Sequence, residues 1–283
     1  MMNHIYRAVL LVLLIQSNVF SQELKKQTWK VAELDREALI HIPENAKSEK
    51  TPVVFAFHGH GGSSVNASRS FRFHQIWPEA IVIYPQGVKT PGLLTDPEGK
   101  RTGWQSSAEA FDGRDLKFFD SMFNWLRKEF QIDEDRIYST GHSNGGGFTY
   151  LLWAERGDLF AAMGPSAAVG LKQLPKLQPK SMIHIAGEND PLVKFEWQKR
   201  MIERVKLLNG TKGDGKPWQD VKYATAFESE NGFRVVSLIH PGKHNYLRES
   251  SEAIVQFFKS ERRKNSSRST EEKDSLKKNP AGQ

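Results

Sequence analysis

A serine in a glycine-flanked turn is the first candidate for chemistry. Gly141-His142-Ser143-Asn144-Gly145 follows a predicted strand, residues 136–140, and precedes a predicted helix. Gly-x-Ser-x-Gly in that setting is typical of a nucleophilic serine on a sharp turn, whose neighbours must be small because the backbone is strained. The motif alone is weak evidence, since a serine that caps a helix in a glycine-rich turn has the same pattern. We predict that Ser143 is the nucleophile.

Such a serine needs a histidine to accept its proton. In chains with this motif the order is Ser, then Asp or Glu, then His. His184, His240 and His244 follow Ser143. His184 alternates within an apolar strand, which is typical of a core residue, and His240 ends the last predicted strand. His244 lies in the turn after that strand, where it can reach over the serine. We predict His244 as the base, with His240 as the alternative.

A carboxylate must orient that histidine, and it is expected just past the strand that contains Ile183. The segment Gly187-Glu188-Asn189-Asp190-Pro191 supplies two. We predict Asp190, with Glu188 in reserve; a turn or helix-cap role before the proline is the structural alternative for Asp190. The chain on either side of this segment is long enough for one helix and one strand. All three loops would then meet at the same edge of a sheet.

The segment Phe57-His58-Gly59-His60-Gly61-Gly62 follows the first strongly apolar run. One donor to the oxyanion of an acyl-transfer reaction comes from the loop after an early strand, and the other is the amide after the nucleophile. We therefore predict the amides of His60 and Asn144 as the donors, each contributing about 3–4 kcal/mol to the transition state. Two histidines at i and i+2 can also ligate a metal, but no carboxylate cluster completes a site. A purely structural glycine-rich loop is a further alternative. No metal and no cofactor are expected.

The elements that must position these residues alternate between strands and helices. The two strands nearest the N-terminus are expected to form an antiparallel hairpin around Asp35-Arg36. The alternation that follows predicts an α/β fold with a mostly parallel central sheet and helices on both faces. Residues 69–78 and 89–104 are predicted to be irregular, and residues 209–219 a surface loop. The predicted strands are residues 28–32, 38–42, 52–57, 81–84, 136–140, 182–186 and 235–239, and the predicted helices begin near residues 112, 144, 195 and 252.

The ends of the chain differ from its middle. Arg7 precedes an apolar run, and fairly small residues surround a possible cut after Ser21, so residues 1–21 are predicted to be a signal peptide; a buried N-terminal helix is the alternative. The run is too short to span a bilayer. Residues 22–260 are predicted to form one domain, and residues 261–283 a disordered basic tail. The protein is expected to be secreted or periplasmic, with no stable membrane insertion after cleavage.

Composition excludes several classes of function. The chain has 283 residues and no cysteine, which rules out disulfides and thiol catalysis. More than half of the net charge of +7 lies in residues 259–283, so the charge of the domain does not indicate a nucleic-acid partner.

These motifs together resemble the α/β-hydrolase family, and within it the secreted esterases that are polyhydroxybutyrate depolymerase-like or feruloyl esterase-like. The resemblance covers about residues 52–258. It implies an ester hydrolase outside the cytoplasm, with a Ser-Asp-His triad at Ser143, Asp190 and His244 and no cofactor. Family members often carry cysteines, and an aromatic or Trp-Pro pair after the histidine, where this chain has Asn245-Tyr246. The matching stretches are His58-Gly59-His60-Gly61-Gly62, Tyr84-Pro85-Gln86-Gly87, Gly103-Trp104, Asp115, Asp135-Arg136-Ile137-Tyr138, Gly141-His142-Ser143-Asn144-Gly145-Gly146, Gly187-Glu188-Asn189-Asp190-Pro191 and Gly242-Lys243-His244.

The sequence thus predicts a secreted serine hydrolase that cleaves a small-molecule or polymeric carboxylic ester through an acyl-enzyme. Aryl or acetyl esters of polysaccharides and short polyesters are the candidate substrates. Trp104, Trp77 and Phe73 are candidates for the substrate pocket, with core packing as their alternative. A peptidase or acyltransferase with the same triad, or a non-catalytic carbohydrate- or polymer-binding protein, are the other hypotheses.

Overall fold

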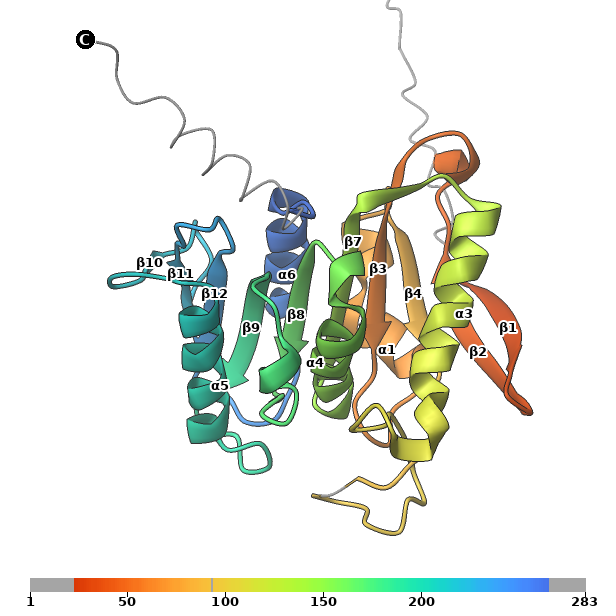
Figure 1. Cartoon of the computed structure of the whole chain (residues 1–283), viewed down its shortest axis with the longest axis horizontal. Helices are drawn as coiled ribbons and strands as arrows, with labels where there is room; N and C mark the ends of the chain where they lie inside the picture. The colour runs from red at the N-terminus through yellow and green to blue at the C-terminus, as the bar shows by residue number, and fades with distance from the viewer. Residues whose placement is uncertain (1–22, 93, 265–283) are drawn as a thin grey trace, which may run out of the picture.

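The computed structural model describes residues 23–92 and 94–264. Its centre is a ten-stranded sheet with the order β1-β2-β4-β3-β7-β8-β9-β12-β11-β10, and β5 and β6 form a separate pair (Figure 1). The neighbours from β4 to β12 are parallel, and the strands at both edges are antiparallel. The strands are β1 Lys25–Val31, β2 Leu34–His41, β3 Thr51–Phe57, β4 Ile81–Pro85, β5 Val88–Lys89, β6 Thr102–Gly103, β7 Ile132–His142, β8 Ala162–Ser166, β9 Ser181–Gly187, β10 Lys216–Pro217, β11 Ala224–Phe227 and β12 Val235–His240. The predicted α/β class with a mostly parallel sheet is confirmed.

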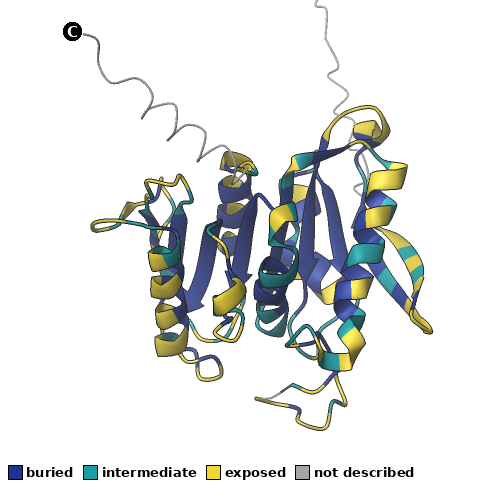
Figure 2. Cartoon of the chain, viewed as in Figure 1, coloured by how far each residue is buried: buried dark blue, intermediate teal, exposed yellow. Residues whose placement is uncertain are grey.

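Helices cover both faces of the sheet. One face packs against α3, α4 and α5, which stand in front of the strands in Figure 1, and the other packs against α1, α2 and α6. Figure 2 shows the central strands as buried and the outer sides of the helices as exposed, which is the pattern of a sheet buried on both faces. The helices are α1 Ser64–Phe71, α2 Phe73–Ile76, α3 Arg114–Glu129, α4 Asn144–Arg156, α5 Phe195–Leu208 and α6 Arg248–Ser260, with 3-10 turns at Glu44–Lys47, Ala110–Gly113, Gly157–Leu159 and Leu174–Lys176.

Apolar pattern explains why these elements form where they do. All seven residues of β3 are buried, as expected for a continuous apolar run in the middle of a parallel sheet. In α3, Leu116, Phe119, Phe123 and Leu126 recur every three or four residues and are all buried. The carboxyl ends of β3, β7, β9 and β12 meet at one edge of the sheet, the lower edge in Figure 1. The loops at that edge carry all the predicted catalytic residues.

Several elements differ from the prediction. The hairpin turn is formed by Ala32 and Glu33, both with positive φ, so Arg36 lies within β2 and is 1% exposed instead of forming the turn. Strand β8, with the sequence Ala-Met-Gly-Pro-Ser, was not predicted because glycine and proline mask its apolar character. The stretch 69–78 is largely helical, and two further antiparallel strands, β10 and β11, extend the sheet beyond β12.

The boundaries at the two ends have different outcomes. The predicted signal peptide, residues 1–21, lies outside the described residues. The prediction that a disordered tail begins at residue 261 is wrong for its first four residues. Glu261 is 4% exposed, its carboxylate accepts a hydrogen bond of 2.7 Å from Ser181 Oγ, and its carbonyl accepts one from Tyr138 Oη. Arg263 N–H donates to the carbonyl of Asp135. The tail sequence therefore joins the domain as far as Lys264, because its first residues find polar partners on the sheet.

Among the buried histidines, His58, His74 and His184 stay neutral. Burial lowers the pKa of His58, His74 and His184 to about 4, from an ordinary value of 6.5. Between these two values the unfolded chain binds more protons than the folded one, so stability falls as the pH falls through this window. Each histidine is expected to reduce the free energy of unfolding by about 1.4 kcal/mol per pH unit there. Urea denaturation between pH 7 and pH 5 measures this slope.

Proton NMR of the histidine rings provides the independent check on that slope. The ring resonances of these three residues should not titrate between pH 7 and pH 5 in the folded protein. A ring that titrates near pH 6.5 would contradict the prediction for that residue, because its neutral form would then not be required for folding.

Candidate active site

Ser143 occupies a strained turn between β7 and α4. Its φ of 56° and ψ of −120° are unfavourable for any residue with a side chain, and such strain is concentrated at functional sites. A Cβ at Gly145 would lie 2.2 Å from the carbonyl oxygen of Phe57, so the turn requires glycine there. The Ser143 side chain makes no capping hydrogen bond to any described residue, which removes the helix-cap alternative. The local chain therefore presents the hydroxyl at the edge of the sheet.

His244 lies beside that hydroxyl, on the loop between β12 and α6. Its Nε2 is 2.8 Å from Ser143 Oγ, and its Nδ1 is 2.7 Å from Asp190 Oδ2. The Nδ1 proton is donated to the carboxylate, which leaves Nε2 free to accept the serine proton. The His244 side chain is 15% exposed and that of Asp190 is fully buried. The structure thus brings the three predicted residues into one hydrogen-bonded chain.

Asp190 is held rigidly at the end of β9. Its Oδ1 accepts hydrogen bonds of 2.9 Å from the amides of Leu192 and Val193, and its Oδ2 accepts one of 3.2 Å from Gln198 Nε2 as well as the bond from His244. These donors fix both carboxylate oxygens, so the histidine ring meets an acceptor in a set position. The turn that holds Asp190 is therefore part of the site geometry rather than an alternative to it.

The reserve candidates lie elsewhere. Glu188 is exposed. His240 is 2% exposed, and its Nδ1 accepts the amide proton of Gly242 within its own turn. His184 is fully buried, where its Nδ1 pairs with the hydroxyl of Tyr150 at 2.9 Å. Tertiary contacts thus separate the candidates that the sequence left open.

The loop that carries His60 lies against the nucleophile turn. A Cβ at Gly59 would lie 3.5 Å from Ser143 Cβ, at van der Waals contact, so the two segments are direct neighbours. Asn144 is the first residue of α4, where amides have no acceptor within the helix. The two predicted oxyanion donors thus belong to segments that flank the serine.

The imidazole of His60 has a separate role in this loop. Its Nε2 lies 3.0 Å from Asp96 Oδ2, which ties the 88–103 segment to the loop after β3. Across residues 23–92 and 94–264, no group of three or more His, Cys, Asp or Glu side chains could hold a metal ion.

His142, inside the serine motif, also reaches the site, and the sequence reasoning gave it no role. Its ring lies 5.0 Å from that of His244 and 5.7 Å from that of Tyr246, measured between centroids, and its Nδ1 is 3.2 Å from Ser166 Oγ. Burial, and then the nearby His244, lower the pKa of His142 to about 4. A neutral ring therefore supports the His244 imidazole. Its position directly before the serine was the one signal that could have identified it.

The three aromatic residues predicted for the substrate pocket are core residues instead. Trp104 is 1% exposed and stacks on Phe148, with centroids 5.4 Å apart. Trp77 is 4% exposed and packs against Tyr138, far along β7 from the serine, and Phe73 is fully buried. The structure contradicts the pocket prediction, because the helices on both faces of the sheet enclose these large apolar surfaces.

The chain is similar in sequence to a peptidase family and to a protein named as an esterase. A model of the prolyl oligopeptidase family matches residues 112–172, which run from α3 through the nucleophile turn to β8. The chain is 25% identical over 218 residues to a protein of Aspergillus flavus named probable feruloyl esterase C, a match that covers 75% of this chain and 77% of that protein.

Solved structures share the fold. An acetyl xylan esterase from Aspergillus awamori superposes with a TM-score of 0.62 at 14% identity, over 83% of this chain and 99% of that chain. The Pyrococcus horikoshii acylaminoacyl peptidase superposes with a TM-score of 0.59 at 15% identity, over 86% of this chain and 42% of that chain. In the described residues, no helix has both the length and the apolar character needed to cross a membrane. The sheet order, the strained serine turn and these matches together show that the chain has the α/β-hydrolase fold.

Proposed function

We propose that this protein is a serine hydrolase that cleaves carboxylic esters. The observation that carries the proposal is the chain of hydrogen bonds from Ser143 Oγ through His244 to Asp190, with lengths of 2.8 and 2.7 Å. Nucleophile, base and orienting acid are recognised by such geometry rather than by position in the sequence. The strained backbone at Ser143 supports the same role, since strain at one residue must be maintained by its surroundings.

The reaction follows from these positions. Ser143 Oγ attacks the ester carbonyl carbon while His244 Nε2 takes the hydroxyl proton, and Asp190 stabilises the imidazolium that forms. The amides of His60 and Asn144 donate to the oxygen that becomes negative in the tetrahedral intermediate. His244 then gives its proton to the leaving alcohol oxygen. Water, deprotonated by the same ring, hydrolyses the acyl-enzyme and restores the serine.

Polysaccharide-linked esters are the substrate class we propose, as aryl or acetyl esters, with short polyesters as a further candidate. The similarity to a probable feruloyl esterase supports aryl esters, and the structural likeness to an acetyl xylan esterase is compatible with acetyl esters. We also propose that the protein acts outside the cytoplasm, on the basis of the leader-like pattern in residues 1–21. N-terminal sequencing of the protein recovered from the periplasm or medium tests that proposal.

A peptidase is the second candidate. The family model that matches residues 112–172 is that of the prolyl oligopeptidases, and those residues contain the strand, turn and helix around Ser143. This element is shared by esterases and peptidases because both reactions pass through the same tetrahedral oxyanion. The matched region thus supports the reaction class without selecting the leaving group.

Labelling with a fluorophosphonate, followed by peptide mapping, is the first experiment. We expect one modified residue, Ser143. Feruloyl, acetyl and short-chain chromogenic esters are then compared with peptide anilides of matched acyl groups, and we expect turnover of the esters to dominate. Dominant anilide cleavage would favour the peptidase, and transfer of the acyl group to an added alcohol would favour an acyltransferase. Polysaccharide binding with no labelling would favour the non-catalytic hypothesis.

A further inference from the structure

The proposed oxyanion donors come from two segments that are far apart in the sequence. His60 follows β3, whereas Asn144 begins α4. Oxyanion donors must be preorganised, since their value depends on small distances to an oxygen that is charged only in the transition state. Something must therefore hold the two segments in register.

A third segment, Thr102–Gln105, contacts both of them. The carbonyl of Thr102 accepts a 2.7 Å hydrogen bond from the amide of Gly61, and Thr102 Oγ1 donates to the carbonyl of Gly62 at 2.5 Å. Two residues later, the amide of Trp104 donates to Asn144 Oδ1 at 2.7 Å, and Asn144 Nδ2 donates back to the Trp104 carbonyl at 3.1 Å. Within this one segment, Thr102 thus binds the loop that carries His60, and Trp104 binds the start of α4.

Gly103 shows how tightly the three segments meet. A Cβ at this position would lie 2.6 Å from His60 Nδ1 and 2.9 Å from Asn144 Oδ1. Real Cβ atoms do not approach other atoms so closely, so any side chain at residue 103 would displace the His60 ring or the Asn144 side chain. The segment also binds the first residue of the loop after β3, because the indole Nε1 of Trp104 donates to the carbonyl of His58 at 2.8 Å. The buried Trp104 therefore connects the loop after β3 with the start of α4.

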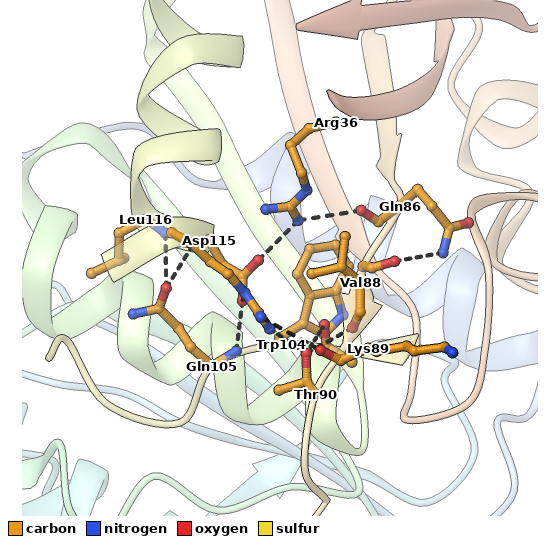
Figure 3. A network of polar contacts seen from close by, with 12 residues as sticks. Arg36, Gln86, Val88, Lys89, Thr90, Trp104, Gln105, Asp115 and Leu116 are labelled. Carbon is orange, nitrogen blue, oxygen red and sulfur yellow. Dashed lines mark hydrogen bonds and ion pairs between the residues drawn. The ribbon is translucent and has the colours of Figure 1, made fainter. Parts of the chain in front are cut away.

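The far end of the segment is anchored in the core. The amide of Gln105 donates to Asp115 Oδ2 at 2.8 Å, and Gln105 Oε1 accepts the amide of Asp115 at 2.6 Å (Figure 3). Arg36 approaches the same carboxylate from β2, with its Nη2 2.8 Å from Asp115 Oδ1. Arg36, Gln105 and Asp115 are each 1% exposed. A buried ion pair is costly to desolvate and gives little stability by itself, so its value here lies in fixing position.

We propose that Thr102–Gln105 is a clamp that holds the two oxyanion donors in register, that Asn144 is its main positioning residue, and that the Asp115–Arg36 pair anchors it. This inference rests on the proposed ester hydrolysis. The Asn144 side chain is occupied on both its oxygen and its nitrogen by the Trp104 peptide, so it acts through the backbone and does not contact substrate. Its removal leaves the amide donor in place but frees it to move.

Asn144→Ala tests the clamp by steady-state kinetics on the best ester of the panel. We expect kcat to fall about ten- to a hundred-fold, somewhat less than for loss of a whole donor, with KM within about threefold. The affinity for an arylboronic acid, which forms a tetrahedral anionic adduct with the serine, should fall by a similar factor. Asn124→Ala, on the exposed side of α3, is the matched control and should keep kcat and KM. An unchanged kcat, or a raised KM alone, would overturn the proposal.

Thr102→Val is the second variant, because it removes one hydroxyl with almost no change of shape. We expect a several-fold loss of kcat, and a loss in the Asn144→Ala double variant smaller than the product of the single losses, since both act on one unit. Thr28→Val, exposed on β1, is its control. Independent losses in the two variants would overturn the shared clamp.

Amide hydrogen exchange gives a readout that does not depend on turnover. The Gly61 amide, which donates to Thr102, should exchange at least about ten-fold faster in Asn144→Ala if the clamp links the two segments. Unchanged exchange would overturn the clamp even if esters are cleaved. Faster exchange in a protein that neither labels with the fluorophosphonate nor cleaves esters would uphold the linkage and refute the proposed function.

Discussion

Replacing Ser143 by alanine is expected to lower kcat for ester hydrolysis about a million-fold. Alanine keeps the Cβ and the strained backbone, whose φ is 56°, but it removes the oxygen that would form the acyl-enzyme. Folding should be preserved, so the melting temperature is expected to stay within a few degrees of the original. The comparison requires initial rates on a chromogenic ester, with the fluorophosphonate probe as a second readout.

Ser121→Ala is the matched control for that change. Ser121 lies on α3 and its hydroxyl donates to the carbonyl of Lys117, away from the site, so its removal should leave the rate unchanged. A variant that lacks both Ser143 and the His244 ring should be no slower than the Ser143 variant alone, because the two groups act as one unit. Substantial ester turnover by Ser143→Ala would refute the proposed nucleophile.

Asp190→Asn is expected to lower kcat about ten-thousand-fold without removing any group that touches the substrate. The asparagine oxygen can still accept from the amides of Leu192 and Val193, which turns its NH2 group towards His244 Nδ1. That ring nitrogen must then accept a hydrogen bond and so cannot carry the proton, which in the neutral ring moves to Nε2. A protonated Nε2 cannot take the proton of the serine hydroxyl.

The same substitution also faces Gln198, whose Nε2 now donates to Asp190 Oδ2. Two NH2 groups would meet there in a buried site, and we expect a loss of about 1–3 kcal/mol in the free energy of unfolding. Measurement of kcat at a temperature where the variant is folded separates the two effects. Glu188→Gln, on the same turn but exposed, is the control and should change kcat less than twofold. A large loss of kcat in Glu188→Gln, with little change of kcat in Asp190→Asn, would identify Glu188 as the acid.

Much of the fold could be predicted because its information is local. Helix α5 begins at the predicted residue, and the apolar face of α3 follows the spacing of four side chains from Leu116 to Leu126. Strand β8 was missed because Gly164 and Pro165 interrupt its apolar pattern, although β7 and β9 pair with it on both sides. Pairing between strands compensates for weak local preference, and such pairing is absent from any single segment.

In the candidate site, the sequence likewise predicts some residues and leaves the place of others undecided. Residue type, chain order and position after strands predict Ser143, Asp190 and His244, and the structure brings those three side chains together. For Trp104 the sequence does not separate a pocket from a core, because an aromatic residue near an active-site loop fits both equally well. Its indole bond to the carbonyl of His58 and its contact with Phe148 decide in favour of the core.

The turn that carries Ser143 is therefore the part of this protein that the sequence by itself determined. The spacing of the glycines, the change from strand to helix and the order of acid and base along the chain can all be identified from the sequence, because none of them depends on tertiary contacts. Only the tertiary structure decided that Asp190 and not Glu188 meets His244, that Arg36 lies in the core beside Asp115, and that Thr102 and Trp104 join the two predicted oxyanion donors. Each of these depends on distances between segments that are far apart in the sequence, and those distances are set by the packing of the whole sheet and its helices.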